Sequence, residues 1–415
     1  MRVVVCGLGH IGSVTAACLL RDGHTIIAVD IDEHKRGCFS RGASPVREAG
    51  VGELIAEGHA KGRLCVTDSR DGLSDADIAI ICVGTPTSAD GAVDLSQVRA
   101  AAATLGEAAR LRSTQLAPML IVFRSTMLPG SMREVVLPGI RAAAGEPPGT
   151  RYEVAYNPEF LRLGSAIADY SAPARIIIGE REPGIAQALR TLYSGIDAPV
   201  FSTTFELAEL AKYADNAFHA LKVAFANEVG RIALHSGVAP ADLAELFLAD
   251  NKLNLSSRYL RPGGAFGGPC LPKDVRALAE HARNAGVAAP VIGHILHSNA
   301  RHADFLVREI ERRAGARARV LLIGLSFKKG TDELRESPFV ALAEALVDRG
   351  HELAIYDPDI KANSSLAHLP ARLSGIVLPE LPDARAFDLV VAGKTDPETL
   401  KALGASSTIF AIDGL

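Results

Sequence analysis

The sequence has no tryptophan, and aromatic residues make up only 5% of its 415 positions. Its six cysteines form no CxxC or CxxH pair, which argues against zinc, so we expect no metal. No apolar run reaches the ~18 residues that a membrane-spanning helix needs. The net charge of −4 gives no basic excess for nucleic acid. We therefore expect neither a membrane segment nor a nucleic-acid partner.

The positions of the cysteines indicate the cellular compartment. Five cysteines lie within the first 82 residues, mostly in apolar segments, and are predicted to be small buried side chains: Cys6, Cys18, Cys38, Cys65 and Cys82. Met1 leads directly into a strand-like run, with no signal peptide ahead of it. We expect a protein of the reducing cytoplasm.

The composition is that of a globular protein, with 48% hydrophobic and 22% charged residues. A chain of 415 residues is too long for one hydrophobic core, so two or three domains are expected.

The N-terminus carries the pattern of a dinucleotide-binding unit. A short apolar strand, Arg2–Cys6, leads into Gly7-Leu8-Gly9-His10-Ile11-Gly12, and an apolar helix pattern follows. A second strand ends at Asp30, 18 residues beyond Gly12. The glycines allow a pyrophosphate to approach backbone N–H groups at the helix N-terminus, where the helix dipole favours an anion. Asp30 would accept hydrogen bonds from a ribose diol and repel a 2′-phosphate, which favours NAD over NADP.

Strands and alanine-rich helices continue to alternate, which predicts a parallel sheet covered on both faces. The predicted strands lie at residues 64–67, 78–82, 119–123, 154–156 and 175–178. Turn-forming residues follow two of them, at 83–86 and 124–130, and ligands of such sheets bind at these strand ends. Glu159 follows another strand end. It is either a solvated turn residue or a part of the cofactor-side site.

One long helix is predicted from Thr203 to about Ser236. Four polar residues on it, Lys212, Asn216, His219 and Asn227, fall within an arc of ~80° at 100° per residue. The surrounding apolar runs predict a helix buried on most sides, so this stripe would line a cavity. The alternative is an ordinary exposed polar face.

A loop at residues 263–274 contains four glycines, two prolines and one cysteine. A thiol in such a loop, with Lys273 and Asp274 close by, has the setting of an activated nucleophile. The alternative is a tight turn in which Cys270 only packs.

A second strand–helix unit begins at Arg319, with further predicted strands at residues 353–357, 388–392 and 408–413. Its first turn, residues 324–332, lacks GxGxxG and contains two lysines, which favours a phosphate-bearing ligand other than a second NAD. The predicted fold is α/β: two Rossmann-like parallel-sheet domains joined by a long central helix and a helical segment.

Seven motifs carry a resemblance to a known family: GLGHIG, VGTP, RSTMLPG, YNPEFL, KYADNAFHALKVAFANE, GGAFGGPCLPKD and GLSFKKGTDELRESP. By these motifs, in this order, the chain resembles the UDP-glucose/GDP-mannose dehydrogenase family to about residue 395. Residues 250–256, the run around His219 and residues 261–278 look like the branch that oxidises GDP-mannose to GDP-mannuronate.

The resemblance implies an NAD-dependent four-electron oxidation of the sugar C6 alcohol to a carboxylate. In that reaction Cys270 holds the C6 aldehyde as a thiohemiacetal and then as a thioester, which water hydrolyses. Lys212 and Asn216 would stabilise the developing oxyanion, and Glu159 would be the general base for hydrolysis. Asp274 and Thr126 would order water and polar contacts around the thiol.

The resemblance also assigns binding positions and domains. NAD would be held at Gly7, Gly9, His10, Ile11, Gly12, Asp30, Lys35, Thr85, Thr126 and Arg335. The nucleotide sugar would be held at His219, Asn227, Tyr259, Arg261, Gly267, Lys273 and Lys328. The implied domains are an NAD-binding domain at 1–202, a central helical dimerisation domain with the cysteine loop at 203–314, and a nucleotide-sugar domain at 315–415. Family members form homodimers through the central helix, and their acid products serve polysaccharide biosynthesis.

Some positions depart from the family pattern. Leu163 stands where the family motif NPEFLRE has its second glutamate, and this leaves Glu159 as the base. A substituted sugar and a slower second step are both compatible with Leu163. UDP-glucose or a UDP-N-acetylhexosamine are the alternative substrates. Two further alternatives are a two-electron dehydrogenase without need of Cys270 and a catalytically silent NAD- or nucleotide-sugar-binding protein.

Overall fold

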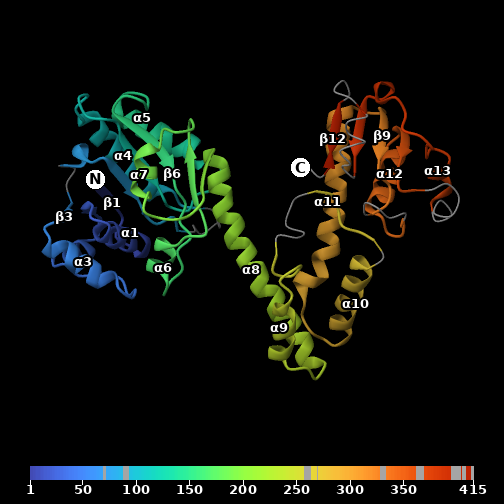
Figure 1. Ribbon diagram of the computed structural model, residues 1–415, viewed down its shortest axis with the longest axis horizontal. Coiled ribbons are helices and arrows are strands. Elements are labelled where there is room, and N and C mark those ends of the chain that lie inside the picture. The colour runs from blue at the N-terminus through green and yellow to red at the C-terminus, as the bar shows by residue number, and fades with distance from the viewer. Residues whose placement is uncertain are drawn as a thin grey trace. The chain divides into compact units, whose positions relative to one another are not determined.

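The structure is a computed structural model, and it describes residues 1–68, 72–86, 93–256, 263–268, 270–327, 333–360, 369–393, 403 and 408–412. The chain divides into two compact units, Met1–His219 and Ala220–Leu415. Figure 1 shows that each unit contains a sheet with helices against it.

The first unit is built on an eight-stranded sheet with the order β3-β2-β1-β4-β5-β6-β7-β8. Its strands are β1 (Arg2–Cys6), β2 (Thr25–Val29), β3 (Leu64–Thr67), β4 (Ile78–Ile81), β5 (Met119–Phe123), β6 (Tyr152–Tyr156), β7 (Ile176–Glu180) and β8 (Val200–Thr203). The predicted parallel sheet is confirmed, except that β7 runs antiparallel to β6. Strand β8 was not predicted, because its short, largely exposed segment lacks a continuous apolar run.

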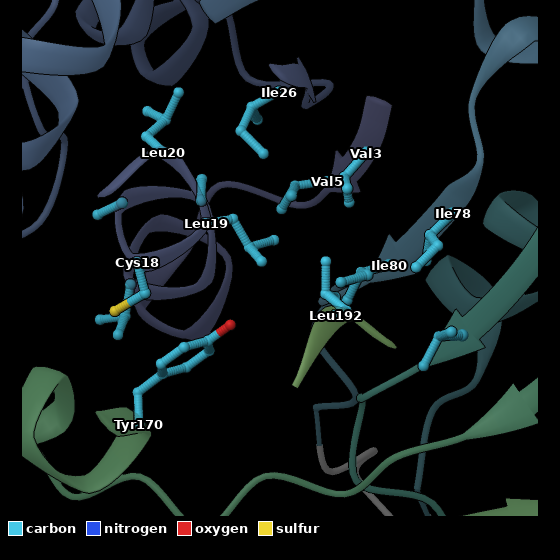
Figure 2. Close-up of a cluster of buried hydrophobic side chains, with 14 of the residues drawn as sticks. Val3, Val5, Cys18, Leu19, Leu20, Ile26, Ile78, Ile80, Tyr170 and Leu192 are labelled. Carbon is cyan, nitrogen blue, oxygen red and sulfur yellow. The ribbon is translucent and has the colours of Figure 1, made fainter. Parts of the chain in front are cut away.

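Both faces of the central strands are buried, as continuous β-branched runs predict. Val3 and Val5 of β1 lie in one apolar cluster, and Val4 lies in the cluster on the opposite face. Figure 2 shows the first cluster, with Val3 and Val5 near Ile78 and Ile80 and with Leu19 of helix α1 (His10–Arg21). Each fully buried aliphatic side chain contributes about 1.5–3 kcal/mol, so this core fixes the strand ends where the turns begin.

The second unit contains a parallel sheet with the order β10-β9-β11-β12. Its strands are β9 (Arg319–Ile323), β10 (Glu352–Tyr356), β11 (Leu389–Ala392) and β12 (Ile409–Ala411). Buried residues of α11 (Pro290–Ala314) and α12 (Pro338–Asp348) pack against this sheet. The predicted second Rossmann-like sheet is confirmed.

The predicted central helix is confirmed as α8 (Phe205–His235). Its predicted burial on most sides is wrong, because Phe218 is 40% exposed and Leu221 is 50% exposed. With 31 residues the helix spans roughly 46 Å. The first unit ends inside the helix, at His219. Lys212, Asn216 and His219 therefore belong to the first unit, and Asn227 belongs to the second.

The remaining elements connect these layers. They are α2 (Glu33–Ser40), α3 (Val51–Ala60), η1 (Leu73–Asp75), α4 (Ser96–Leu111), η2 (Met132–Val136), α5 (Leu137–Ala144), α6 (Ala166–Ser171), α7 (Gln187–Leu192), α9 (Pro240–Ala249), α10 (Leu271–Asn284), α13 (Ala371–Ser374) and η4 (Ala384–Ala386). Among the described residues, no helix has the length and apolarity to cross a membrane.

One cysteine differs from its prediction. Cys6, Cys18 and Cys38 are buried, but Cys65 is exposed. Cys65 lies on β3, the edge strand of the sheet, and no described strand pairs with the outer side of β3.

Candidate functional site

The glycine-rich turn after β1 has the geometry that a dinucleotide needs. Gly7 has φ +92°, and a Cβ at Gly7 would lie 2.8 Å from the Cys82 carbonyl oxygen. A Cβ at Gly12 would lie 1.7 Å from the Gly7 carbonyl oxygen, so only glycine permits this contact between turn and helix. Gly9 caps the N-terminus of α1, and a Cβ there would meet no atom within 4 Å. The turn thus leaves open space at a helix N-terminus, which fits a pyrophosphate.

Asp30 holds this turn from the neighbouring strand. Its Oδ2 accepts a hydrogen bond from the Leu8 N–H at 2.6 Å, and its Oδ1 accepts one from the Asp32 N–H at 2.8 Å. Lys35 Nζ lies 3.6 Å from Asp30 Oδ2. Each carboxylate oxygen keeps a second lone pair, so Asp30 also has acceptor capacity for a ribose diol. The turn and Asp30 together fit NAD.

His10 links the turn to a segment that the sequence did not single out. Its Nε2 lies 3.4 Å from Glu48 Oε2, and Glu48 also accepts hydrogen bonds from the Gly164 and Ala166 N–H groups at 2.8 and 3.0 Å. These two hydrogen bonds, and to a lesser extent His10, lower the pKa of Glu48. Leu163, 79% exposed, immediately precedes this anchored segment. No local sequence pattern around Glu48 indicates that it binds backbone groups as distant in the sequence as Gly164 and Ala166.

The turns after β4 and β5 are joined to each other. Thr85 Oγ1 donates a hydrogen bond to the Thr126 carbonyl oxygen at 2.9 Å. Ser125 Oγ donates to the Val83 carbonyl oxygen at 2.7 Å, and Tyr156 OH at the end of β6 donates to the Ser125 carbonyl oxygen at 3.2 Å. The structure therefore brings Thr85 and Thr126 together at the carboxyl edge of the sheet.

Lys212 and Glu159 form an ion pair in a largely dry environment. Lys212 Nζ lies 2.9 Å from Glu159 Oε1, and the two side chains are only 9% and 11% exposed. Glu159 Oε2 accepts a hydrogen bond from the Leu161 N–H at 2.7 Å, and the Lys212 ammonium lies 5.3 Å from the Phe160 ring centroid. Residues 53 positions apart in the sequence thus place an acid–base pair and a fixed positive charge in one site.

Glu209, which belongs to none of the sequence motifs, fixes the helix that carries Lys212. It is fully buried, and it accepts hydrogen bonds from the Gly130 and Met132 N–H groups at 2.7 and 2.8 Å. Burial raises the pKa of Glu209, although these two hydrogen bonds act in the opposite direction. An acid three residues before Lys212 on an otherwise apolar helix face was the available signal.

A cavity of about 430 Å³ lies beside this pair, within the first unit. Glu159, Phe160 and His219 line it, together with Arg175, which pairs with Asp215 at 2.6 Å. Asn216 is exposed and does not line the cavity. The predicted polar stripe is therefore divided: Lys212 is buried in the ion pair, and His219 faces the cavity.

Cys270 is exposed and lies at the start of α10 in the second unit. Its carbonyl oxygen accepts a hydrogen bond from the Asp274 N–H at 2.9 Å. Lys273 and Asp274 pair with each other, Nζ to Oδ1, at 2.9 Å. Arg335 pairs with Glu333, which raises the pKa of Arg335, and the nearby Cys270 adds a smaller contribution. The structure thus brings Cys270, Asp274 and Arg335 into one neighbourhood.

The first turn of the second sheet repeats the Asp30 arrangement. Gly324 has φ +90°. Asp357 Oδ2 accepts hydrogen bonds from the Leu325 and Ser326 N–H groups at 2.7 and 2.8 Å, and its Oδ1 accepts one from the Asp359 N–H at 2.9 Å. An acid after the second strand of each Rossmann-like unit therefore holds the preceding turn.

The remaining predicted residues are located as follows. Gly267 lies in the loop before Cys270, and Asn227 is exposed on the second-unit part of α8. Tyr259, Arg261 and Lys328 lie outside the described residues. Within the described residues, no group of three or more His, Cys, Asp or Glu side chains is placed to hold a metal ion.

Three family models match the chain in sequence. They are the NAD binding domain, the central domain and the UDP binding domain of the UDP-glucose/GDP-mannose dehydrogenase family, at residues 1–197, 206–301 and 321–403. The NAD binding assignment agrees with the geometry of the glycine turn and Asp30.

Relatives match over most of their length. The GDP-mannose 6-dehydrogenase of Pseudomonas aeruginosa is 42% identical, over 87% of this chain and 82% of the relative. That of Pseudomonas putida is 40% identical, over 97% and 93%. The UDP-glucose 6-dehydrogenase of Pseudomonas aeruginosa is 34% identical, over 100% and 93%.

A solved structure, a ternary complex of GDP-mannose dehydrogenase from Pseudomonas aeruginosa, is similar with a TM-score of 0.93 and 38% identity, covering 99% of this chain and 96% of that chain. A UDP-glucose dehydrogenase from Pyrobaculum islandicum is similar with a TM-score of 0.58 and 31% identity, covering 99% and 94%.

Proposed function

This chain belongs to the UDP-glucose/GDP-mannose dehydrogenase family as an NAD-dependent nucleotide-sugar 6-dehydrogenase, and from that premise we propose that it oxidises GDP-mannose to GDP-mannuronate. The identity to GDP-mannose 6-dehydrogenases supports this substrate, at 40–42% against 34% for a UDP-glucose 6-dehydrogenase.

The chemistry rests on one observation above the others, the dry ion pair of Lys212 and Glu159. A fixed ammonium stabilises negative charge that develops on the C6 oxygen, because it lies in a site where water screens it weakly. Asn216, one turn along α8, would donate a second hydrogen bond to that oxygen. Bound NAD would supply the hydride acceptor for each of the two oxidations at C6.

Cys270 acts between the two oxidations. Its sulfur forms a bond to the aldehyde carbon, and the carbonyl electron pair moves to oxygen, which gives a thiohemiacetal. Loss of hydride from this adduct leaves a thioester. Glu159 takes a proton from water, the water oxygen attacks the thioester carbon, and the carbon–sulfur bond breaks to give the acid and the free thiol. Asp274 and Thr126 order the polar contacts around the sulfur.

The binding residues of this proposal are those that the family resemblance assigns. NAD is held at Gly7, Gly9, His10, Ile11, Gly12, Asp30, Lys35, Thr85, Thr126 and Arg335. The nucleotide sugar is held at His219, Asn227, Tyr259, Arg261, Gly267, Lys273 and Lys328. Leu163 offers no carboxylate for acid–base chemistry, so hydrolysis of the thioester falls to Glu159.

The chain forms a homodimer through its central helices in this proposal. Large apolar side chains are exposed along α8 and α9, namely Leu207, Leu210, Phe218, Leu221, Leu234, Leu246, Phe247 and Leu248. Exposed apolar surface of this extent is typical of an interface, and a second copy of the chain is the partner that the family supplies.

The test is a panel of GDP-mannose, UDP-glucose and UDP-N-acetylhexosamines, with NADH measured per nucleotide sugar consumed. We expect turnover of GDP-mannose with two NADH per sugar. One NADH per sugar would indicate a two-electron dehydrogenase, and no NADH would indicate a binding protein. Turnover of a UDP sugar alone would refute the proposed substrate. A Cys270→Ser variant that still converts sugar fully to acid would refute the role of the thiol.

A further inference from the structure

Helix α11 holds the backbone ahead of Cys270 at three atoms. Asn299 Oδ1 accepts a hydrogen bond from the Phe266 N–H at 2.9 Å, and Asn299 Nδ2 donates one to the Phe266 carbonyl oxygen at 2.8 Å. His302 Nε2 lies 2.7 Å from the Gly263 carbonyl oxygen. A carbonyl only accepts, so Nε2 is the nitrogen that carries the proton. Residues three apart share one helix face, and Asn299 and His302 therefore act as one clamp.

The clamp stands on a fixed support. Glu228, 3% exposed, accepts hydrogen bonds from the Val291 and Ile292 N–H groups at the start of α11, at 2.8 and 2.9 Å. Towards the other end of α11, buried residues such as Leu306 and Ile310 belong to the core of the second unit. The helix is anchored on both sides of Asn299 and His302, so these side chains present a stable surface to the loop.

The loop is also held from its other side. The Gly268 N–H donates a hydrogen bond to the Glu336 carbonyl oxygen at 2.9 Å. A Cβ at Gly267 would lie 2.3 Å from the same oxygen, so the backbone passes very close to residues 336–338. Residues 263–268 form no helix or strand. The clamp and the Glu336 contact therefore fix the path of residues 263–268, just ahead of Cys270.

We propose that Asn299 and His302 are positioning residues that set the Cys270 thiol for attack on the aldehyde carbon. The proposal rests on the proposed role of Cys270. A reacting pair must approach to about 3–3.5 Å, and a displacement of about 1 Å costs on the order of 10²-fold in rate. Oxidation of the alcohol to the aldehyde needs no sulfur, so a loosened loop impairs the second oxidation and spares the first. The aldehyde then escapes before the thiol captures it.

Three variants test the clamp. Asn299→Asp keeps the side-chain volume and the acceptor for the Phe266 N–H, but it places a carboxylate oxygen against the Phe266 carbonyl. His302→Ala removes the donor to Gly263, and His302→Gln retains an N–H donor. Arg301→Ala is the matched control, because Arg301 is an exposed neighbour on α11 that pairs only with Asp304 in the described part of the chain. Each variant is assayed with GDP-mannose in the presence of hydroxylamine, which traps free aldehyde as an oxime.

We expect Asn299→Asp and His302→Ala to form acid 10- to 100-fold more slowly, to release between one and two NADH per sugar, and to accumulate oxime. His302→Gln and Arg301→Ala should behave like the wild-type protein, and the Kd for NAD should be unchanged throughout. The proposal is overturned if Asn299→Asp and His302→Ala give the same NADH ratio and rate as Arg301→Ala. Cys270→Ala is run in parallel. If Cys270→Ala releases aldehyde while the clamp variants do not, only the role of the clamp is refuted. If Cys270→Ala completes the oxidation to the acid, the roles of both the clamp and Cys270 are refuted.

Discussion

At the scale of single residues, the Lys212–Glu159 ion pair is where a substitution tests the proposed chemistry most directly. Glu159→Gln preserves the shape and the acceptor for the Leu161 N–H, but it removes the proposed base and leaves the Lys212 ammonium buried beside a neutral amide. We expect a burst of about two NADH per Cys270, followed by turnover slowed by about 10²- to 10⁴-fold, because both oxidations precede hydrolysis. Stopped-flow absorbance measures the burst, and mass spectrometry of the quenched protein detects the thioester.

The unpaired lysine also lowers stability, by roughly 3–5 kcal/mol for a buried pair that loses one partner. The burst is therefore normalised to folded protein. Glu182→Gln, at an exposed glutamate in the same unit, is the control. Steady turnover of Glu159→Gln at the wild-type rate would show that another group activates the water.

The two strand-end acids offer a matched pair of substitutions. Asp30→Asn and Asp357→Asn each replace a carboxylate whose Oδ2 accepts a hydrogen bond from the preceding turn and whose Oδ1 accepts one from the N–H group two residues on. Each variant should lose about 1–3 kcal/mol of stability, because a buried N–H faces an amide donor in place of an acceptor. Only Asp30→Asn should also weaken NAD binding, by about tenfold or more. Calorimetry and NADH fluorescence titration separate the two effects. An equal loss of NAD affinity in Asp357→Asn would mean that Asp30 affects NAD binding only by stabilising its turn, and not by a direct contact with the ribose.

Sequence reasoning at this scale identified the residues with strong local signatures. The glycines of the first turn and Asp30 were found because a tight turn and a helix N-terminus constrain neighbours in the chain. Glu48, Glu209 and Asn299 were missed, because each of them binds backbone groups of a distant segment. A backbone N–H or carbonyl has no side-chain identity, so the sequence does not mark it as a partner.

At the scale of elements, Glu209 docks α8 on the turn after β5 and makes that contact dependent on pH. Burial raises the pKa of Glu209 above its usual value of 4.5. The folded protein then binds this proton more tightly than the unfolded chain, so stability falls as pH rises from 4.5 to the folded pKa. Glu209→Gln keeps one oxygen acceptor and does not titrate. We expect the Tm of the variant minus that of the wild-type protein to increase between pH 4.5 and 7.

Glu206, on the same turn of α8, provides the control for this experiment. A backbone hydrogen bond and the nearby Arg133 lower the pKa of Glu206, so its contribution is lost as pH falls. The Tm difference for Glu206→Gln should therefore stay nearly constant between pH 4.5 and 7 and change in the opposite direction only below pH 4.5, where the change should be small because the side chain is 37% exposed. Parallel slopes for the two variants would contradict the assignment of Glu209.

The elements themselves were largely predictable. Continuous β-branched runs located all the strands of both sheets but β8, and α8 was predicted to within two residues at each end. Periodicity gives the polar face of a helix but not what covers the other faces. The predicted burial of α8 was too high for that reason, since Phe218 and Leu221 are of residue types common in cores but are exposed.

At the scale of the whole molecule, the proposed catalytic residues are divided between two units. Glu159 and Lys212 belong to Met1–His219, and Cys270 belongs to Ala220–Leu415. The sequence order of the motifs predicted both sheets and the helix between them, because each Rossmann-like unit carries its own strand–turn–helix signature.

The proposed homodimer can be tested at an exposed leucine of α9. Leu246 on α9 is 74% exposed, and Leu111 at the end of α4 is exposed to a similar degree, 68%. Leu246→Glu places a charge in the proposed interface, and the twofold symmetry of a dimer counts the change twice. Burial of a leucine contributes about 1.5–3 kcal/mol, so two copies lower the dimer affinity by about 10²- to 10⁴-fold. Sedimentation velocity over a range of concentrations should show dissociation of Leu246→Glu, whereas Leu111→Glu should remain dimeric. A wild-type protein that sediments as a monomer would contradict the proposed homodimer. A Leu246→Glu variant as tightly dimeric as Leu111→Glu would exclude α9 from the interface, because a carboxylate buried without a partner cannot leave the association unchanged.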